Sequence, residues 1–184
     1  MALFKLKKSG GPRDLDLSMA GLKLGSRVLQ LGNDGELIAV LAGAVGISGE
    51  ACSVTEDETA AVRIGRAAAG AGVLVDVRVA PFGALPYDAD AFDVVVLADM
   101  IGSLHINERV VCLQQALRVL RPGGRCLVIE RAARGGIGAV FSQRSLDPGY
   151  RAGGGAVAAL TAEGFRAVRV LAEHSGRHFI EGTK

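Results

Sequence analysis

A short glycine turn behind an apolar run is the first place in this sequence where residue types suggest ligand binding. The run RVLQL (27–31) is followed at once by Gly32-Asn33-Asp34-Gly35. Glycine at such a turn permits positive φ and lets a ligand approach the backbone and the amides that follow. We therefore expect the turn to face a nucleotide-like cofactor. The alternative is a tight turn in which the Asn33 and Asp34 side chains bond the nearby backbone.

Two further side chains, Asp99 and His105, could orient a substrate or transfer a proton. Asp99 follows the apolar run DVVVL (93–97), so its carboxylate could orient a hydroxyl or an amine. His105 could act as a general base because histidine exchanges its proton near neutral pH. Each has a structural alternative, since Asp99 can cap a loop and His105, just ahead of Asn107, can begin a helix. Both interpretations are open at this point.

Composition and charge narrow the class of protein. The 184 residues fit one domain that needs neither disulfides nor a structural metal. Lysine and arginine number 21 against 19 acids, a net charge of +2, which is not the footprint of a nucleic-acid binder. Cys52, Cys112 and Cys126 are far apart and lie in apolar runs, so we expect buried thiols in a reducing cytosol and no metal site.

Nothing in the chain predicts targeting or membrane anchoring. The segment before Gly10 is too short for a signal-peptide core, and no later segment resembles a membrane span. We therefore expect a cytoplasmic protein, and the abundance of Ala, Gly, Val and Arg without Trp is consistent with a bacterial source. Because Gly10, Gly11 and Pro12 oppose regular structure, residues 1–13 are predicted to be a flexible leader and residues 14–184 a single domain.

Short β-branched runs alternate with longer helical patterns, which predicts a parallel sheet covered on both faces. The glycine- and arginine-rich stretch 131–155 is predicted to be a loop, and residues 156–164 a helix. The runs 165–173 and 177–182, joined by Ser175-Gly176, are predicted to close the chain as an antiparallel hairpin. The predicted parallel strands are 27–31, 51–55, 73–79, 93–97 and 125–130.

Two of the intervening helices carry signals of their own. Thr55-Glu56-Asp57-Glu58 matches a capping box, in which the Thr55 hydroxyl accepts from the Glu58 amide and the Glu58 side chain bonds back to the cap. A later helix, ended by Pro122-Gly123-Gly124, is predicted to dock on the sheet through apolar side chains at three- and four-residue steps. These side chains are Ile106, Val110, Leu113, Leu117 and Leu120.

Three segments, in this order, resemble the class I S-adenosylmethionine-dependent methyltransferases. RVLQLGNDGEL (27–37) is similar to the family's first motif, a strand entering a glycine turn. ALPYDADAFDVVVLADMI (84–101) is similar to the segment through the fourth strand, and LRVLRPGGRCLVIE (117–130) to the helix end, turn and fifth strand. The Pro-Gly-Gly turn at the right distance from the earlier segment is the more specific signal. The resemblance covers nearly the entire chain from about Leu22.

The resemblance implies a doubly wound, Rossmann-like α/β fold of seven strands in the order 3-2-1-4-5-7-6, with the last strand antiparallel. The general resemblance of the chain is to the small-molecule branch that includes ubiquinone and menaquinone biosynthesis methyltransferases. This implies S-adenosylmethionine as cofactor and a small-molecule acceptor. The cofactor contacts that it implies are Gln30, Gly32, Asn33, Asp34, Gly35, Thr55, Glu56, Phe82, Gly83, Leu97 and Ala98.

The chain departs from the family pattern where that pattern sets an acid after each of the first three strands. This chain has Gln30, Thr55 and Pro81 there, and its glycine turn is one residue short. A threonine hydroxyl cannot replace both hydrogen bonds of a ribose-binding carboxylate, each worth roughly 1.5–3 kcal/mol. Asp34 also puts a negative charge where the methionine carboxylate would pass. We therefore expect cofactor affinity to suffer.

Other residues could compensate for these changes. Glu56 could reach the ribose, and the backbone of Phe82 or Gly83 together with the Phe82 ring could meet the adenine. The structural alternatives are a helix-capping or surface role for Glu56 and a core position for Phe82 beside Leu85.

By family topology the methyl acceptor binds beyond the fourth and fifth strands. Four arginines in or beside the glycine-rich stretch could clamp an anionic acceptor, or could simply be solvated. The expected neighbours of the acceptor are Asp99, Met100, His105, Glu130, Arg131 and Arg134, and the four arginines are Arg131, Arg134, Arg144 and Arg151.

Three functions compete on this sequence. The first is a small-molecule methyltransferase, and the second is a degenerate, non-catalytic domain that serves as a binding or interaction module. The third, a nicotinamide-binding Rossmann protein, is weaker because Gly32 and Gly35 do not complete the Gly-x-Gly-x-x-Gly fingerprint.

Overall fold

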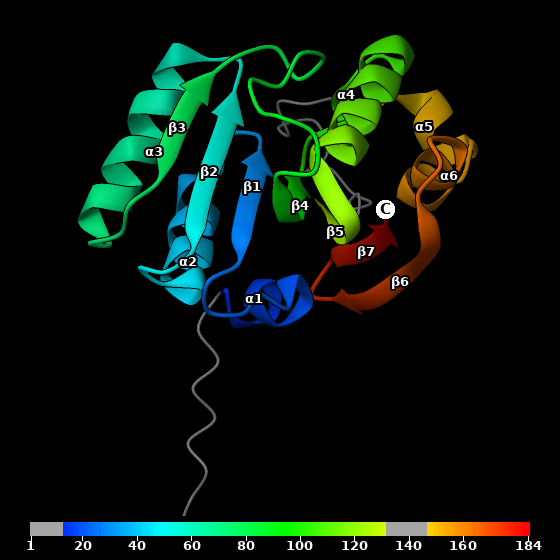
Figure 1. The fold of residues 1–184 in the computed structure, drawn as a ribbon. Coiled ribbons are helices and arrows are strands. Elements are labelled where there is room, and N and C mark those ends of the chain that lie inside the picture. Colours follow the sequence, from blue (N-terminus) through cyan, green and yellow to red (C-terminus); the bar gives the residue numbers. More distant parts are fainter. Residues whose placement is uncertain (1–12, 132–146) are drawn as a thin grey trace, which may run out of the picture.

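The computed structural model describes residues 13–131 and 147–184, which form a seven-stranded sheet with helices on both faces (Figure 1). The strand order is β3-β2-β1-β4-β5-β7-β6; β7 is antiparallel to both neighbours and the other pairs are parallel. The predicted fold class and strand order are therefore confirmed. The strands are β1 (Arg27–Leu31), β2 (Glu50–Thr55), β3 (Asp76–Val79), β4 (Phe92–Ala98), β5 (Leu120–Arg131), β6 (Arg166–His174) and β7 (Arg177–Thr183). The helices are α1 (Asp14–Ala20), α2 (Gly35–Val45), α3 (Glu58–Gly70), α4 (Ile106–Val119), α5 (Pro148–Ala152) and α6 (Gly155–Ala162), with a 3₁₀ turn η1 (Ile101–Ser103).

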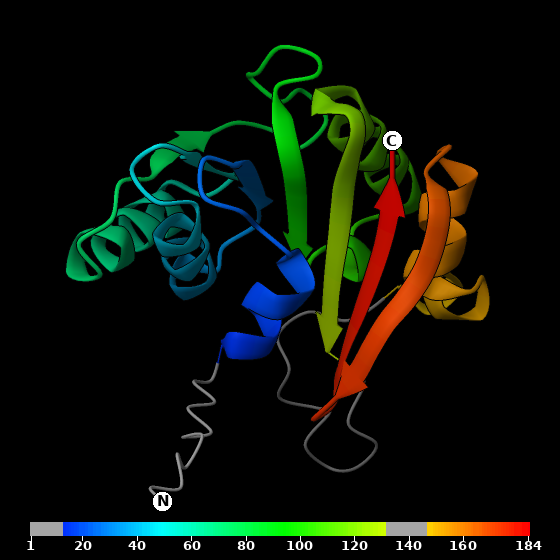
Figure 2. The ribbon, with the colours of Figure 1, turned by 60° about the horizontal axis from the view of Figure 1, so that its bottom comes forward.

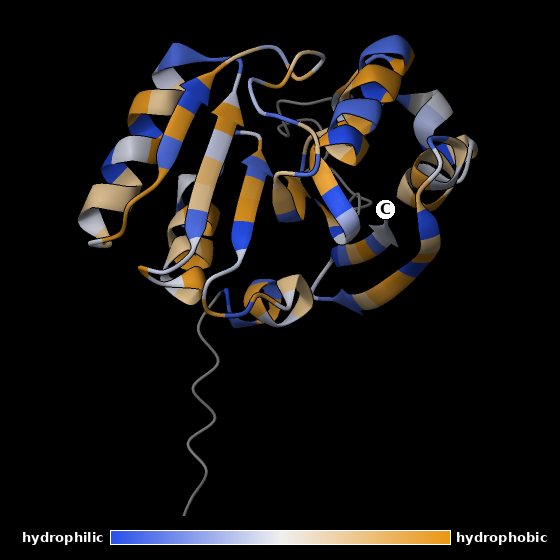
Figure 3. Cartoon of the chain, in the orientation of Figure 1, coloured by the Kyte–Doolittle hydropathy of each residue, from blue (hydrophilic) through white to orange (hydrophobic). Residues whose placement is uncertain are grey.

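Two apolar clusters hold these layers together, one on each face of the sheet. Side chains of α1, α2 and α3 pack against one face, and side chains of α4, α5 and α6 pack against the other (Figure 2). Hydrophobic residues concentrate in the central strands, whereas α3 and α4 mix hydrophobic and hydrophilic positions (Figure 3). This is the pattern of a doubly wound sheet whose helices bury one side each. No helix within the described ranges has the length and apolar character needed to cross a membrane.

The strands were the most predictable elements. The first strand has the predicted bounds, the second begins one residue earlier, and the fourth is one residue longer at each end. The third begins three residues later than predicted, and the fifth begins at Leu120, so Pro122-Gly123-Gly124 lies within β5 and does not end the preceding helix. The terminal hairpin is confirmed, because β6 and β7 pair antiparallel around Ser175 and Gly176. Both turn residues have positive φ, 50° and 72°, as a two-residue turn that matches the twist of the strands requires.

The predicted capping box at Thr55 is wrong. Asp57 is the N-cap of α3, and its side chain accepts from the Thr59 amide at 2.8 Å. Thr55 is instead the last residue of β2 and is fully buried. The strand therefore continues through Thr55, and an aspartate, a stronger capping residue type than threonine, begins the helix two residues later.

The predicted apolar stripe on α4 is partly wrong. Leu113 is buried, but Ile106 is 58% exposed and Leu120 already belongs to β5. The buried side of α4 consists of Arg109, Cys112, Leu113, Ala116 and Val119. The helix docks through this smaller and partly polar set because its first turns face α5 and α6 as well as the sheet.

The stretch predicted to be a loop, 131–155, also needs correction. Residue 131 is the last residue of β5. Helix α5 occupies 148–152, and α6 begins at residue 155. Asp147 caps α5 through the Gly149 amide at 2.9 Å, and Pro148 stands at its first position, which proline tolerates. Residues 132–146, and the leader up to residue 12, lie outside the described residues.

An ion-pair network fixes α1 against the rest of the fold. Asp16 is fully buried, and its two carboxylate oxygens lie 3.1 Å from Arg13 Nη1 and 2.6 Å from Arg177 Nη1. Arg13, which the sequence suggested was part of the leader, is the residue that precedes α1. Arg125 of β5 adds bonds to the carbonyls of Met19 and Ala20 at the other end of the helix.

We predict that Asp16→Asn lowers the free energy of unfolding by roughly 3 kcal/mol, because it leaves two partly buried guanidinium groups without their shared counter-charge. Urea denaturation of the two proteins measures the difference. Glu36→Gln is the control: this side chain is 84% exposed at 3.6 Å from Arg13, so a change within about 0.5 kcal/mol is expected. Equal losses in both variants would contradict the assignment.

Candidate functional site

The candidate site is the crevice at the carboxyl ends of β1 and β4. These strands are neighbours in the sheet but not in the sequence, so the chain winds away from them in opposite directions. Open α/β sheets bind ligands at such a switch point, because no connection crosses it. Leu97 and Ala98, both buried, end β4 on one side of the crevice, and Gly32 follows β1 on the other.

Gly32 has the backbone that the sequence predicts. Its φ is +119°, and its N–H donates to the Val54 carbonyl at 3.0 Å. A Cβ here would be in van der Waals contact with the end of β4 and the residues after it, 3.5 Å from the Ala98 oxygen and 3.8 Å from Met100 Sδ. Glycine is therefore needed for the conformation, and it lets the turn lie close to the end of β4.

Gly35 has a different reason to be glycine. Positive φ was expected here, and the structure shows this to be wrong. A Cβ at Gly35 would lie 3.0 Å from Ile64 Cα and 3.1 Å from Ala67 Cβ, so the residue allows the beginning of α2 to touch α3. The glycine therefore serves helix packing directly beneath the turn.

Asn33 and Thr55 connect the turn to the end of β2. The Thr55 hydroxyl donates to Asn33 Oδ1 at 2.6 Å and accepts from the Asp57 amide at 3.2 Å. The Asn33 side chain thus bonds a residue of a neighbouring strand. The tight-turn alternative, in which it would bond the nearby backbone, is therefore wrong for Asn33. Two of the implied cofactor-binding residues are in direct contact here, at the position where the family has a ribose-binding acid.

Asp34 combines a capping role with an ion pair. Its side chain accepts from the Leu37 amide at 3.0 Å, which begins α2, and both carboxylate oxygens accept from Arg13 Nη2, at 2.9 and 2.8 Å. The negative charge that the sequence placed at the turn is therefore offset by a guanidinium. The local-backbone alternative holds for the Asp34 side chain.

Gln30 shows that the crevice has an unfilled hydrogen-bonding position. Its Nε2 donates to the Asp34 carbonyl at 2.9 Å, which orients the side chain towards the turn. Its Oε1 is buried and has no partner among the described residues. A buried acceptor without a donor costs roughly 1–3 kcal/mol, and a donor group bound at the turn would relieve this cost. This unpaired acceptor beside the glycine turn is a structural feature that fits a polar ligand.

Glu56 and Phe82 form the wall beyond β2 and β3. Glu56 Oε1 accepts from the Phe82 amide at 2.9 Å, so the backbone donor considered for adenine is bonded within the protein. Phe82 is buried in the same apolar cluster as Leu85, in agreement with the core alternative. A Cβ at Gly83 would lie 3.2 Å from Val111, so this loop rests on α4.

Asp99 and His105 lie where their structural alternatives place them: Asp99 ties down a loop, and His105 begins a helix. Asp99 has a φ of +52°, and its carboxylate accepts from the Arg131 amide at 2.9 Å and pairs with Arg131 Nε at 3.0 Å. It therefore ties the end of β4 to the end of β5. His105 precedes α4 as its N-cap residue, and its backbone N–H donates to Glu108 Oε2 at 3.1 Å.

A polar cluster that the sequence did not predict lies beside these residues. Tyr150 of α5 donates to Glu130 Oε1 of β5 at 2.5 Å, and Arg109 Cζ of α4 stacks 4.5 Å from the Tyr150 ring centroid. Arg109 Nη2 in turn bonds Asp147 Oδ2 at 2.7 Å, and this holds the pKa of Asp147 below its ordinary value. Glu130 was expected to lie near the methyl acceptor. Its partner Tyr150 belongs to the stretch 131–155, which was predicted to be a loop and instead contains α5.

The cysteines have no signs of reactivity. Burial raises the pKa of Cys52 and of Cys112 to about 12, so both thiols stay protonated at neutral pH. Cys126 is fully buried, and burial raises its pKa as well. Within the described ranges, no group of three or more His, Cys, Asp or Glu side chains is arranged to hold a metal ion.

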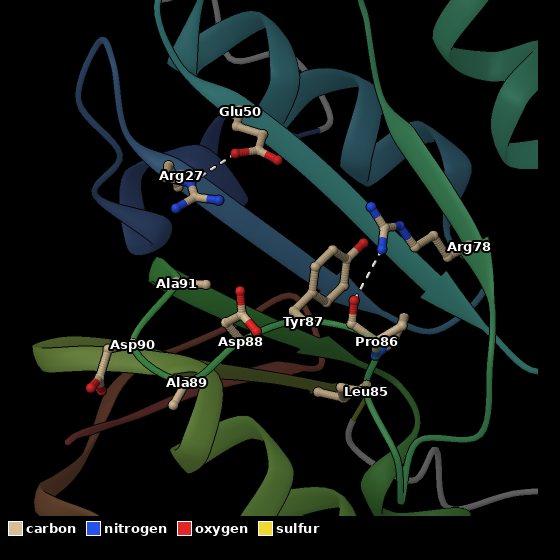
Figure 4. A pocket seen from close by; sticks show the side chains of 10 residues that line it. All are labelled: Arg27, Glu50, Arg78, Leu85, Pro86, Tyr87, Asp88, Ala89, Asp90 and Ala91. Atoms are coloured by element: carbon tan, nitrogen blue, oxygen red, sulfur yellow. Dashed lines mark hydrogen bonds and ion pairs between the residues drawn. The ribbon is translucent and has the colours of Figure 1, made fainter.

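A surface cavity at the opposite edge of the sheet is a less suitable site. Residues at the starts of β1 and β2 line it together with the loop 85–91 (Figure 4). Both of its arginines already have partners: Arg27 pairs with Glu50 at 2.7 Å, and Arg78 donates to the Pro86 carbonyl at 3.0 Å. The amino edge of a parallel sheet also lacks the switch-point opening.

Comparison with known proteins identifies a family. A family model described as a methyltransferase domain matches residues 29–128, which include the turn and the strand ends around the crevice. A ubiquinone/menaquinone biosynthesis C-methyltransferase, UbiE, of Idiomarina loihiensis is 32% identical over 118 residues. The match covers 62% of this chain and 46% of that protein, so the chain spans less than half the length of this relative.

Solved structures agree on the fold. A SAM-dependent methyltransferase from Aquifex aeolicus superposes with a TM-score of 0.74 at 19% identity, covering 94% of this chain and 89% of that one. The [4+2]-cyclase SpnF superposes with a TM-score of 0.65 at 24% identity, covering 86% and 56%. Since one neighbour bears the name of a cyclase, the fold alone does not determine the reaction.

We predict that the stability difference between the wild type and Glu130→Gln depends on pH. Burial raises the pKa of Glu130, outweighing the Tyr150 hydrogen bond that acts in the opposite direction. The fold thus favours the protonated carboxyl, whose contribution is complete below the ordinary pKa of 4.5 and is lost as the pH rises through the raised value. The wild type should therefore lose stability relative to Glu130→Gln as the pH rises above 4.5.

Urea denaturation at several pH values measures this trend. Glu58→Gln, in the exposed first turn of α3, is the matched control. A pH-independent difference for Glu130→Gln would mean that the carboxyl is not destabilised by its surroundings.

Proposed function

Because the chain belongs to the methyltransferase domain family, we propose that it transfers a methyl group from S-adenosylmethionine to a small molecule. The observation that carries this proposal is the turn at Gly32, where positive φ and the unpaired buried acceptor of Gln30 coincide at the switch point of the sheet. The relatives' names support a small-molecule acceptor, and those names refer to proteins of which the match with this chain covers 46%.

The residues proposed to hold the cofactor surround this crevice. The turn 32–35 and Gln30 would meet its amino-acid end, Thr55 and Glu56 its ribose, and Phe82 with Gly83 its base, while Leu97 and Ala98 form the opposite wall. Thr55 and Glu56 are engaged with Asn33 and Phe82, so ligand binding would have to share or exchange these bonds. This cost supports the expectation that affinity is lower than with acids at these positions.

The bound sulfonium supplies an activated methyl group for in-line displacement, a reaction that depends on positioning and exclusion of water. The side chains around the crevice fit that role, since Met100 and the ends of β1 and β4 are buried. Asp99 and His105 remain weak candidates for direct catalysis, because both are engaged in the local structure.

An anionic acceptor remains a prediction only. Arg131 is paired with Asp99, Arg151 is exposed, and Arg134 and Arg144 lie outside the described residues. The alternative of a non-catalytic interaction module finds no support in the matched family or in the relatives.

Isothermal titration with S-adenosylmethionine and S-adenosylhomocysteine tests the cofactor proposal. We expect both ligands to bind, and Gly32→Ala to weaken them at least about tenfold, or 1.4 kcal/mol, because its Cβ enters the crevice from a strained backbone. Gly43→Ala in α2 is the control, since a Cβ there meets nothing within 4 Å.

The control variant should bind as the wild type does and gain about 0.5–1 kcal/mol in stability from the better helix former. No heat of binding at millimolar ligand, with a cooperatively folded protein, would reject the cofactor. Unchanged binding in folded Gly32→Ala would move the cofactor away from this crevice.

A further inference from the structure

The ion pair between Arg13 and Asp34 connects α1 with the glycine turn. Arg13 immediately precedes α1, and Asp34 lies inside the turn 32–35 as the N-cap residue of α2. Arg13 Nη2 lies 2.9 and 2.8 Å from the two carboxylate oxygens of Asp34. The two side chains are 21 positions apart in the sequence, so the pair forms only when α1 is docked on the fold.

Arg13 is also anchored on the side away from the turn. Its Nη1 lies 3.1 Å from Asp16 Oδ2, and the other Asp16 oxygen lies 2.6 Å from Arg177 Nη1. Asp16 is fully buried, whereas the side chains of Arg13 and Asp34 are 20% and 24% exposed. The guanidinium is therefore held by a buried carboxylate and presents Nη2 to the turn. A guanidinium fixed in this way loses little further freedom when it pairs with a second carboxylate.

The charge of the turn depends on this pair. Asp34 is the charged residue of the turn 32–35. Among the described residues, its other donor is the Leu37 amide, at 3.0 Å, and an amide offsets only part of a full negative charge. Glu36, which follows the turn, adds a further negative charge at 3.6 Å from Arg13. Without Arg13 the turn would therefore present a net negative charge.

A negative turn conflicts with the ligand of the proposed function, on which this inference rests. The turn and Gln30 are proposed to meet the amino-acid end of the cofactor, which ends in a carboxylate and an ammonium group. Two carboxylates at close range repel each other, and a guanidinium bonded to one of them removes most of that repulsion. Both terminal nitrogens of Arg13 are already engaged by acids, so Arg13 supplies the turn with a neutralised Asp34 and not with a free cation.

We propose that Arg13 is a positioning residue that acts through Asp34: by neutralising this acid it allows a ligand carboxylate to lie at the turn. A helix that precedes the first strand thus determines which ligands the turn accepts. With Arg13 in place the site takes the complete cofactor. Without it the site favours a nucleoside that has the amine but lacks the carboxylate.

The test compares two ligands that differ only in the carboxylate. S-adenosylhomocysteine carries it, and S-adenosyl-3-thiopropylamine has the same nucleoside, thioether and amine without it. Calorimetry on the full chain measures both affinities. We expect Arg13→Gln to weaken S-adenosylhomocysteine at least about tenfold, because the unpaired Asp34 repels the carboxylate. The amine should bind this variant at least as tightly as the wild type, because the same acid attracts its ammonium group.

A second substitution separates the effect of charge from an effect on structure. Asp34→Asn removes the charge and keeps a residue type that caps helices well. In the Arg13→Gln background it should restore S-adenosylhomocysteine affinity to within about threefold of the wild type, because the two residues act as a pair. A loss that came only from an undocked α1 would affect both ligands and would not be rescued.

Arg27→Gln is the matched control. Arg27 is likewise paired with an acid, Glu50 at 2.7 Å, but at the amino edge of the sheet, so its replacement should change neither affinity. Asp34→Asn alone keeps the test informative if Arg13→Gln does not fold, since it retains the pair between Arg13 and Asp16. This single variant should bind S-adenosylhomocysteine severalfold more tightly relative to the amine, because the Arg13 charge then has no acid at the turn.

The outcomes separate this inference from the proposed function. Equal losses of both ligands in Arg13→Gln would overturn the inference, because the effect would then be structural. A double variant as weak as Arg13→Gln would also overturn it, because Arg13 would then act on the ligand directly. Binding of both ligands to the wild type, with no selective change in any variant, would reject the inference alone. A folded wild type that binds neither ligand would reject the proposed function and the inference with it.

Discussion

The reversal of winding between β1 and β4 is the constraint on which the rest of this structure depends. Because α2 leaves β1 towards one face and η1 with α4 leaves β4 towards the other, the carboxyl ends of these neighbouring strands have no connection above them. The backbone at Gly32 turns in this opening with a conformation that glycine tolerates. The positions of Asn33, Thr55, Glu56 and Asp99 around the opening follow from the sheet order.

The departures from the family pattern form a connected set. With Gln30 and Thr55 in place of acids, neutral hydrogen bonds to Asp34 and Asn33 hold the turn, and the one acid introduced at the turn, Asp34, is paired with Arg13. The sequence alone suggested repulsion between Asp34 and the methionine carboxylate of the cofactor. Arg13, which precedes the first residue of α1, reduces this repulsion by pairing with Asp34. At this turn the chain thus carries a different arrangement of charges from the family pattern, with Asp34 neutralised by Arg13.

Sequence periodicity was sufficient for elements whose environment repeats along the chain. The buried strands and the Ser175-Gly176 hairpin were predictable because alternation and turn chemistry are local signals. The capping box failed because Thr55 and Asp57 are both acceptable caps, and the length of β2, set by pairing with β1 and β3, decides between them. The Glu130 and Tyr150 pair could not be predicted, since the two residues are twenty positions apart and meet only when α5 docks.

The range of the family match separates the part of this chain that is shared with its relatives from the part that is its own. The matched family model ends at residue 128, so it includes the crevice and stops before Glu130, α5 and α6. In the polar cluster, Glu130, Asp147 and Tyr150 come from the unmatched part, and the tie to α4 passes through Arg109, a charged residue on a buried helix face. Burying that guanidinium is unfavourable unless Asp147 and Tyr150 are in place, so the cluster forms as a unit or not at all. The part of the chain that the family model matches and the part that builds this cluster therefore meet at the end of β5.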